Sequence, residues 1–168
     1  YSGSVFSVLS IFWKVFLIVI IMHLAYLLLL FVVAGSVGGK NPFTLVRNQI
    51  PAYLTAVGTQ SSAATIPVNL NCAKNNGVSE DIRNFVVPLG ATIHLAGSMI
   101  TITSCTVAVL LMYNLPMSIG MIIGFIATLG IAMVAAPGAP GGAIMSALPF
   151  LPMVGIVSDT MQQLMITL

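Results

Sequence analysis

Charged side chains are scarce in this sequence of 168 residues. Lys, Arg, Asp and Glu make up only 5% of it, whereas 58% of the residues are hydrophobic and the mean hydropathy is +1.10. A soluble domain carries roughly a quarter charged residues, so the composition excludes an ordinary soluble protein. It indicates an integral membrane protein whose surroundings are the lipid bilayer. The net charge of +2 is too small to indicate a nucleic-acid partner.

The sequence also lacks the residue patterns of a metal centre, a disulfide framework or an enzyme. Its two cysteines, Cys72 and Cys105, lie inside apolar segments without metal-ligand spacing, so we expect buried thiols and no disulfide. No nucleophile–base pair appears, so we expect no enzymatic activity and no covalent cofactor. The chain opens at Tyr1 and stops at Leu168 inside an apolar run, and we expect it to be part of a longer protein.

One apolar run is long enough to cross a bilayer. Residues 12–37 predict a transmembrane helix, because about 20 apolar residues span the hydrocarbon core. Trp13 and Lys14 are typical of an interfacial anchor. His23 interrupts the run, and an ionisable side chain at that depth faces other helices rather than lipid. We expect His23 to hydrogen-bond to a neighbouring helix; the alternative is a proton carrier.

The segment 43–73 is apolar but poorly suited to a simple crossing, because it holds two prolines and a hydroxyl-rich centre at residues 59–67. Basic residues, which prefer the cytoplasmic side, flank both of its ends: Lys40, Arg47, Lys74 and Arg83. This pattern predicts a re-entrant hairpin that turns at residues 59–63. A polar turn at membrane depth must line an enclosed or water-filled cavity. The alternative is a single span distorted by proline.

Residues 80–113 predict a second transmembrane helix that is partly unwound. Ser79 is a good N-cap, and the acids that follow it suit the first turn of a helix. The middle of the segment, residues 88–98, combines Pro, two Gly, two hydroxyl side chains and a His. Discontinuous helices of this kind bind ions and substrates in transporters. The alternative is a kinked helix whose small residues only allow close packing.

Residues 117–156 repeat the hairpin pattern. Two apolar arms enclose a Pro- and Gly-rich centre at residues 137–142, which would suit a gate that moves. Ser158 and Asp159 then cap a further helix that begins at residue 160. The expected fold is therefore an all-α integral membrane protein with transmembrane helices and two re-entrant helical hairpins.

Four motifs follow one another in the chain: residues 59–67 (TQSSAATIP), 76–79 (NGVS), 88–93 (PLGATI) and 137–145, which begins PGA and ends GAIM. In this order they resemble the dicarboxylate/amino acid:cation symporter family, which includes the sodium-coupled glutamate transporters. The resemblance implies a secondary active symporter for an amino acid or small dicarboxylate, coupled to Na⁺ or H⁺. Residues 1–168 would form one partial transport domain, which moves like an elevator within a homotrimer in the plasma membrane.

The resemblance also implies a binding site. The expected substrate-binding residues lie at the two hairpin tips and after the helix break: Gln60, Ser61, Ser62, Ser98, Pro137 and Gly138. Gly90 and Thr92 match residues whose main-chain carbonyls bind sodium. His94 replaces a family asparagine and Ala96 replaces the family aspartate, which removes oxygen ligands that a hard cation prefers. His94 would therefore belong to a sodium or proton site.

Two other functions fit the same broken helices. The first is a passive channel or pore, from which saturable, counterflow-competent uptake would distinguish a carrier. The second is a transport-inactive remnant, which the loss of the aspartate at Ala96 motivates.

Overall fold

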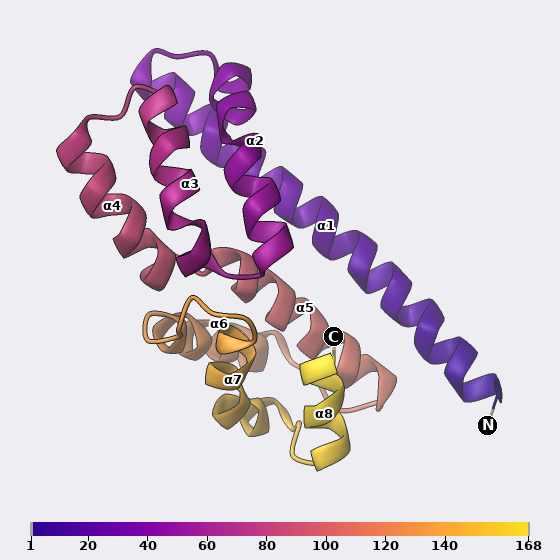
Figure 1. The fold of residues 1–168 in the computed structure, drawn as a ribbon. Helices are drawn as coiled ribbons and strands as arrows, with labels where there is room; N and C mark the ends of the chain where they lie inside the picture. Colours follow the sequence, from indigo (N-terminus) through magenta and orange to yellow (C-terminus); the bar gives the residue numbers. More distant parts are fainter. Residues whose placement is uncertain (1, 168) are drawn as a thin grey trace. The chain divides into compact units, whose positions relative to one another are not determined.

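The computed structural model describes residues 2–167, and the side chains of residues 12–167. Every regular element in this part of the chain is a helix, which confirms the predicted all-helical class (Figure 1). In chain order the elements are α1 (Ser2–Gly38), α2 (Pro42–Thr59), α3 (Ser62–Asn75), α4 (Glu80–Ile93), α5 (Ala96–Met112), α6 (Ile119–Met133), α7 (Gly142–Ala147), the 3₁₀ helix η1 (Leu148–Val154) and α8 (Asp159–Thr167).

Two stretches of the described part of the chain are long and apolar enough to cross a membrane, judged by length and composition. The first, Phe12–Gly38, has 27 residues and exposes large apolar side chains along its length, such as Trp13 and Leu29. The second, Glu80–Met112, has 33 residues and consists of α4 and α5. Between these two helices the backbone of His94 and Leu95 is not helical. The expected interruption within residues 88–98 therefore takes the form of a two-residue break.

The chain divides into two compact units. Unit 1 consists of Tyr1–Leu24, Ala96–Met133 and Ile144–Leu168, and unit 2 consists of Ala25–Leu95 and Val134–Ala143. Most of both arms of the second predicted hairpin thus belongs to unit 1. Its Pro- and Gly-rich centre, residues 137–142, belongs to unit 2 together with the adjoining ends of the arms, residues 134–136 and 143.

Unit 1 has an apolar core. Helix α6 packs against η1 and α5, and α5 also packs against α8. The core side chains are fully or almost fully buried: Val109, Leu110, Phe125, Leu129, Leu151, Val154 and Ile156. One polar side chain lies among them, since Thr106 is 0% exposed and its Oγ1 has no hydrogen-bond partner among the described residues. The return arm stays short because Pro149 and Pro152 cannot donate to a helical ladder, and Gly155 at φ 85° ends it.

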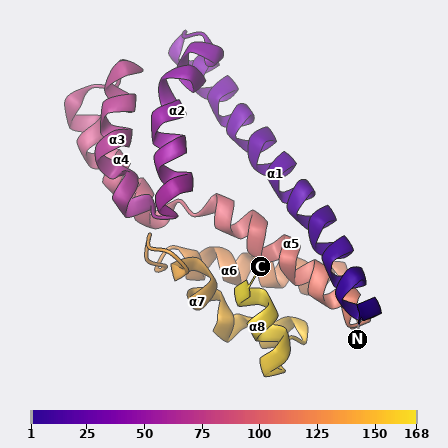
Figure 2. The same ribbon diagram turned by 45° about the vertical axis from the view of Figure 1, so that its right-hand side comes forward.

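Unit 2 is built on two antiparallel helices, α2 and α3, which lie side by side and are joined at Gln60 and Ser61; α4 packs against α3 (Figures 1 and 2). The prolines within the arms, Pro51 and Pro67, do not break them, because each removes only one hydrogen bond of its helix. The segment is therefore a helical pair, not a single kinked helix, and its turn is narrower than the predicted residues 59–63.

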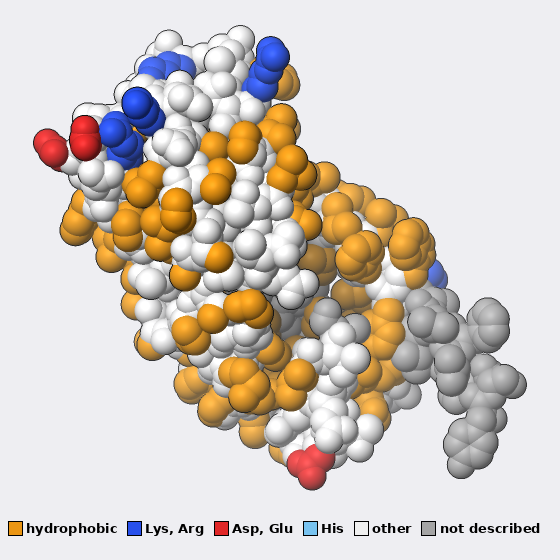
Figure 3. All heavy atoms as spheres, in the orientation of Figure 1, with side chains coloured by type: hydrophobic (Ala, Val, Ile, Leu, Met, Phe, Trp, Pro, Cys, Tyr) orange, Lys and Arg blue, Asp and Glu red, His pale blue; other side chains and the backbone are white. Residues whose placement is uncertain are grey.

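The other end of the α2–α3 pair is a polar corner. Lys40 Nζ donates to the carbonyl of Asn76, and Asn48 Nδ2 donates to Asn76 Oδ1 at 2.9 Å. Figure 3 shows Lys, Arg and acidic side chains gathered at this end of unit 2. Both flanks of the segment thus lie at one end of the unit. The expected Ser79 cap is wrong in one respect: its side chain makes no capping hydrogen bond.

Candidate functional site

Three segments of unit 2 meet at Gly138. Its carbonyl accepts a hydrogen bond from Ser61 Oγ at 2.8 Å and another from the Ala63 backbone N–H at 3.1 Å. A Cβ on Gly138 would lie only 2.6 Å from the carbonyl oxygen of Ala91 in α4 and 3.3 Å from Ser62 Cβ. Only glycine fits this position without displacing backbone. The α2–α3 turn, the loop of residues 134–141 and the end of α4 therefore form one junction.

The turn itself is built by Gln60 and Ser61. Gln60 ends α2 in the left-handed conformation (φ 51°), which a residue with a side chain adopts at some cost, and its N–H donates to the Ala56 carbonyl at 2.8 Å. Ser61 is the N-cap of α3, because its Oγ accepts from the Ala64 N–H at 3.2 Å. Both hydrogen-bonding roles of the Ser61 hydroxyl are thus used inside the protein.

The end of α4 offers free carbonyl oxygens. The Gly90 carbonyl accepts the His94 N–H at 3.0 Å, but no described backbone N–H donates to Ala91 or Thr92, because the helix stops at Ile93. Carbonyls at a helix C-terminus carry partial negative charge. Such an end can bind a cation, as broken helices do in transporters. Of the expected ligands, Thr92 therefore has an available carbonyl, whereas that of Gly90 already holds a helical hydrogen bond.

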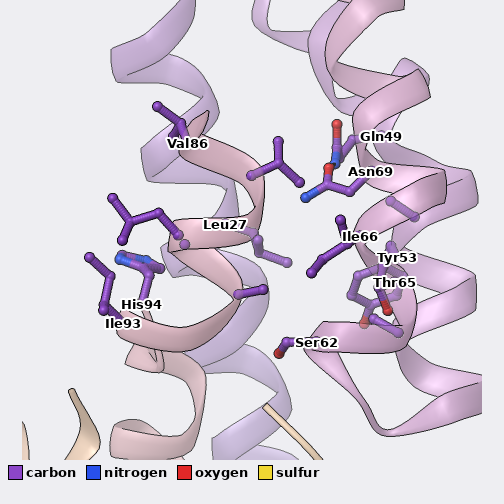
Figure 4. A pocket seen from close by; sticks show the side chains of 16 residues that line it. Leu27, Gln49, Tyr53, Ser62, Thr65, Ile66, Asn69, Val86, Ile93 and His94 are labelled. Carbon is purple, nitrogen blue, oxygen red and sulfur yellow. Dashed lines mark hydrogen bonds between the residues drawn. The ribbon is translucent and has the colours of Figure 1, made fainter. Parts of the chain in front are cut away.

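Unit 2 contains a cavity of about 680 Å³ between the α2–α3 pair and α4, lined also by one α1 residue, Leu27 (Figure 4). Ser62, Gly90 and His94 line it, as the sequence predicted for binding residues. Figure 4 shows the Ser62 side chain at one end of the cavity and His94 on the α4 side. None of the residues lining the cavity is Lys, Arg, Asp or Glu. The cavity is therefore polar in places but uncharged.

His94 is held by α1. Its Nε2 lies 3.3 Å from the hydroxyl of Tyr26, and the two rings stack with centroids 6.5 Å apart at an interplanar angle of 15°. The break after α4 thus leaves the imidazole on the cavity wall, supported from one side by an aromatic ring.

Sequence reasoning missed four polar residues of the cavity wall. Gln49 and Tyr53 are one turn apart on α2, and Thr65 and Asn69 are one turn apart on α3. Gln49 Nε2 donates to Asn69 Oδ1, which joins the two arms. The spacing of these residues in the sequence could have revealed them, because polar residues at positions i and i+4 of an apolar helix lie on one face of that helix.

Ser98 and Ala96 lie in the first turn of α5 and belong to unit 1. Pro137 precedes Gly138 in the loop of unit 2. The structure therefore brings Gln60, Ser61, Ser62 and Gly138 together at the junction, while Ser98 is placed in the other unit.

These features define a class: a helical membrane protein with a broken helix and an uncharged polar cavity beside the break, the architecture typical of carriers. The chain belongs to the sodium:dicarboxylate symporter family, whose model matches residues 1–168. The family membership confirms the predicted resemblance and the expectation that the chain is not an enzyme.

Individual relatives are transporters by name. Excitatory amino acid transporter 1 of Rattus norvegicus is 33% identical over 121 residues, which are 71% of this chain and 22% of the relative. Excitatory amino acid transporter 3 of Homo sapiens is 35% identical over 121 residues, 71% of this chain and 23% of the relative. The serine/threonine transporter SstT of Acinetobacter baylyi is 35% identical over 125 residues, 74% of this chain and 31% of the relative. The chain thus spans less than a third of each relative.

Proposed function

We propose that the whole protein is a secondary active symporter that carries an amino acid or small dicarboxylate across the plasma membrane together with a cation. The observation that supports this most is the junction at Gly138, where a hairpin turn, a Pro- and Gly-rich loop and the free carbonyls of α4 meet. A gate and a binding site placed at the same point are what a carrier needs in order to enclose its cargo.

The substrate contact is assigned to Ser62 rather than to Ser61. The Ser61 hydroxyl already donates to Gly138 and accepts from Ala64, whereas the Ser62 side chain lines the cavity without a hydrogen bond among the described residues. A free hydroxyl can bind the carboxylate or ammonium of an amino acid. Gln60, Pro137 and Gly138 would shape the entrance of the cavity.

The absence of charged side chains from the cavity wall favours a substrate without net charge. Of the two substrate classes, the cavity therefore fits a neutral amino acid better than a dicarboxylate. The check is competition in proteoliposomes: unlabelled L-serine should reduce uptake of a labelled amino acid more strongly than succinate does at the same concentration. Stronger competition by succinate would contradict this choice.

The coupling cation, Na⁺ or H⁺, is assigned to the end of α4. The Thr92 carbonyl would provide a free oxygen and the Gly90 carbonyl only its second lone pair, whereas His94 provides nitrogen, which suits Na⁺ poorly. His94→Asn would restore an amide oxygen and should strengthen the sodium dependence of uptake, measured as the ratio of initial rates with Na⁺ and with choline. An unchanged ratio would argue against a role of His94 at the cation site.

The arrangement in the membrane follows the family resemblance. We infer that α2–α3 and the α6–η1 segment are re-entrant hairpins, that the protein has several membrane-spanning helices, and that this domain moves like an elevator within a homotrimer. The polar corner supports the first hairpin, because both of its flanks lie at one end of unit 2.

A passive pore and an inactive remnant are the competing functions. The full-length protein, reconstituted in liposomes and preloaded with unlabelled substrate, should take up labelled substrate transiently against its concentration gradient. A carrier shows this counterflow and saturates, whereas a pore only equilibrates the label. Equilibration of the label without saturation would show that the protein is a pore and not a carrier. No uptake under any cation gradient would show that it is a transport-inactive remnant.

A further inference from the structure

A polar side chain in an apolar helix points to a ligand when part of its hydrogen-bonding capacity is left free. His23 of α1 has a partner for each ring nitrogen, since Nε2 lies 3.0 Å from the Gly97 carbonyl of α5 and Nδ1 lies 2.7 Å from the Val19 carbonyl. The contact with α5 confirms the prediction that His23 bonds to a neighbouring helix. The side-chain amides of Gln49 and Asn69, in the cavity wall of unit 2, are a different case.

The hydrogen bond between Gln49 and Asn69 uses only part of what the two amides offer. Gln49 Nε2 donates to Asn69 Oδ1, and among the described residues no bond returns from Asn69 Nδ2 to Gln49 Oε1. A side-chain amide carries one accepting oxygen and a nitrogen with two N–H groups. The amide pair therefore keeps a free oxygen on one residue and a free NH₂ group on the other. Exchanging oxygen and nitrogen in both amides leaves this result unchanged.

The free groups of the amide pair are open to the cavity. Both side chains are half-buried and line it, and Figure 4 shows the amide nitrogen of Asn69 turned into the cavity. Thr65, which also lines the cavity, is already engaged, since its Oγ1 donates to the Ser61 carbonyl at 2.8 Å. A molecule in the cavity can therefore reach one free donor and one free acceptor at the amide pair.

The distance between the amide pair and Ser62 limits the size of that molecule. About two turns of α3 separate Ser62 from Asn69, so their Cα atoms are roughly 10 Å apart. A hydrogen bond at each end takes up about 2.9 Å, which leaves roughly 5 Å for the ligand. Apolar side chains, among them Leu27 and Ile66, line the cavity as well. This arrangement fits a small amino acid whose α-carboxylate or ammonium meets Ser62 and whose side chain ends at the amide pair.

The amide pair distinguishes side chains by their hydrogen-bonding groups. A carboxamide has an oxygen that accepts from the free NH₂ group and an N–H that donates to the free oxygen. A carboxylate only accepts, and a thioether or aliphatic side chain has no N–H or O–H to donate. These side chains would leave polar groups of the wall without partners, and that loss is what lets a polar site reject a ligand of similar shape.

We propose that Gln49 and Asn69 are specificity-determining residues, and that they select an amino acid with a carboxamide side chain, namely asparagine or glutamine. The inference rests on the proposed function, which places the substrate in this cavity. It narrows the neutral amino acids to those whose side chain both donates and accepts.

The direct test measures binding and not transport. The full-length protein, held in lipid nanodiscs in a sodium-containing buffer, is titrated calorimetrically with L-glutamine, L-asparagine and L-methionine. L-Methionine is close to L-glutamine in length but has no N–H in its side chain. We expect L-glutamine or L-asparagine to bind at least about tenfold more tightly than L-methionine. Equal affinities, or no binding of any of the three, would overturn the proposal.

Two variants test the amide pair itself. Asn69→Leu and Gln49→Met each remove one amide at similar side-chain size, and each should lower the preference for the carboxamide over L-methionine at least about fivefold. The preference compares two ligands on one protein, so a loss of folded protein does not change it. Asn71→Leu, at an exposed position of α3 that does not line the cavity, is the matched control and should keep the preference. An unchanged preference in both cavity variants would show that other residues select the side chain.

Uptake in proteoliposomes separates this inference from the proposed function. Counterflow of labelled L-serine, together with equal binding of L-glutamine and L-methionine, would support the carrier and reject the role of the amide pair. Tight binding of L-glutamine that depends on Asn69, without uptake of labelled L-glutamine under a Na⁺ or H⁺ gradient, would support the amide pair and reject the carrier.

Discussion

Different interactions stabilise the interior of each of the two units. Unit 1 buries a set of apolar side chains around α5, α6 and η1, and the hydroxyl that is buried among its described side chains, on Thr106, has no described partner. Unit 2 buries few side chains, and its segments are joined by polar contacts at Asn76, between Gln49 and Asn69, and at Gly138. Dense apolar packing resists deformation, whereas a few hydrogen bonds beside a cavity can be exchanged at small cost.

This difference assigns a structural role to unit 1 and a role in binding to unit 2. Nearly all residues predicted to bind substrate or cation lie in unit 2, together with the cavity and the free carbonyls of α4. A site that must bind and release a ligand needs polar groups that can change partners. Substitutions in unit 1 should therefore act on stability, and substitutions at the junction of unit 2 should act on transport.

The largest effect is expected for Phe125→Ala in unit 1. Phe125 is 0% exposed, so its loss leaves a cavity whose lining atoms lose their contacts, which costs roughly 3 kcal/mol. The free energy of unfolding of the purified full-length protein measures this change. Ile123→Ala on the same helix, at a position that is 60% exposed, is the control and should cost far less. Equal losses would mean that unit 1 has no specific core.

Gly138→Ala tests the junction of unit 2. The new methyl group would lie 2.6 Å from the Ala91 carbonyl oxygen, so the loop must move away from the end of α4. We expect uptake to fall at least about tenfold, which corresponds to roughly 1.4 kcal/mol, with little change in the unfolding midpoint. Gly58→Ala on α2, where a Cβ meets nothing within 4 Å, should retain uptake. A Gly138→Ala protein that transports normally would show that the junction is not a gate.

The neighbouring serines separate the two roles within unit 2. Ser61→Ala removes the cap of α3 and the bond to Gly138, and should lower the free energy of unfolding by about 1 kcal/mol. Ser62→Ala removes a hydroxyl that has no described partner, so stability should stay the same while KM for the substrate rises roughly fivefold. The reverse result would move the substrate contact from Ser62 to Ser61.

The smallest effect is expected for Thr106→Val, which removes the unpartnered hydroxyl from the core of unit 1. Valine has the same shape, so the change should raise the free energy of unfolding by up to about 1 kcal/mol. Thr128→Val is the control, since Thr128 Oγ1 donates to the Gly124 carbonyl at 3.0 Å and its removal should not stabilise the protein. Destabilisation by Thr106→Val would show that this hydroxyl has a hydrogen-bond partner in the full-length protein.

The helical pair α2–α3 shows which features of the fold the local sequence predicts and which it does not. The hydroxyl-rich centre at residues 59–67 and the basic residues at both flanks were enough to predict that the chain turns back on itself. They were not enough to place the turn, because the left-handed conformation of Gln60 depends on how the two arms pack. The prolines in the arms suggested distortion, yet both helices continue through them, since one missing hydrogen bond does not outweigh the packing of the pair.

The sequence by itself determined the membrane character, the helical class, the position of the broken helix and the family, because composition, apolar length and local motifs act over short stretches of chain. Only the tertiary structure showed that Gly138 receives hydrogen bonds from Ser61 and Ala63, that Gln49 meets Asn69 in the cavity wall, and that His23 faces two carbonyls. Apart from the contact of His23 with Val19 one turn earlier, these contacts join residues far apart in the chain, from 20 residues for Gln49 and Asn69 to 77 for Ser61 and Gly138. Their partners are chosen by how the helices pack, a choice that local sequence does not contain.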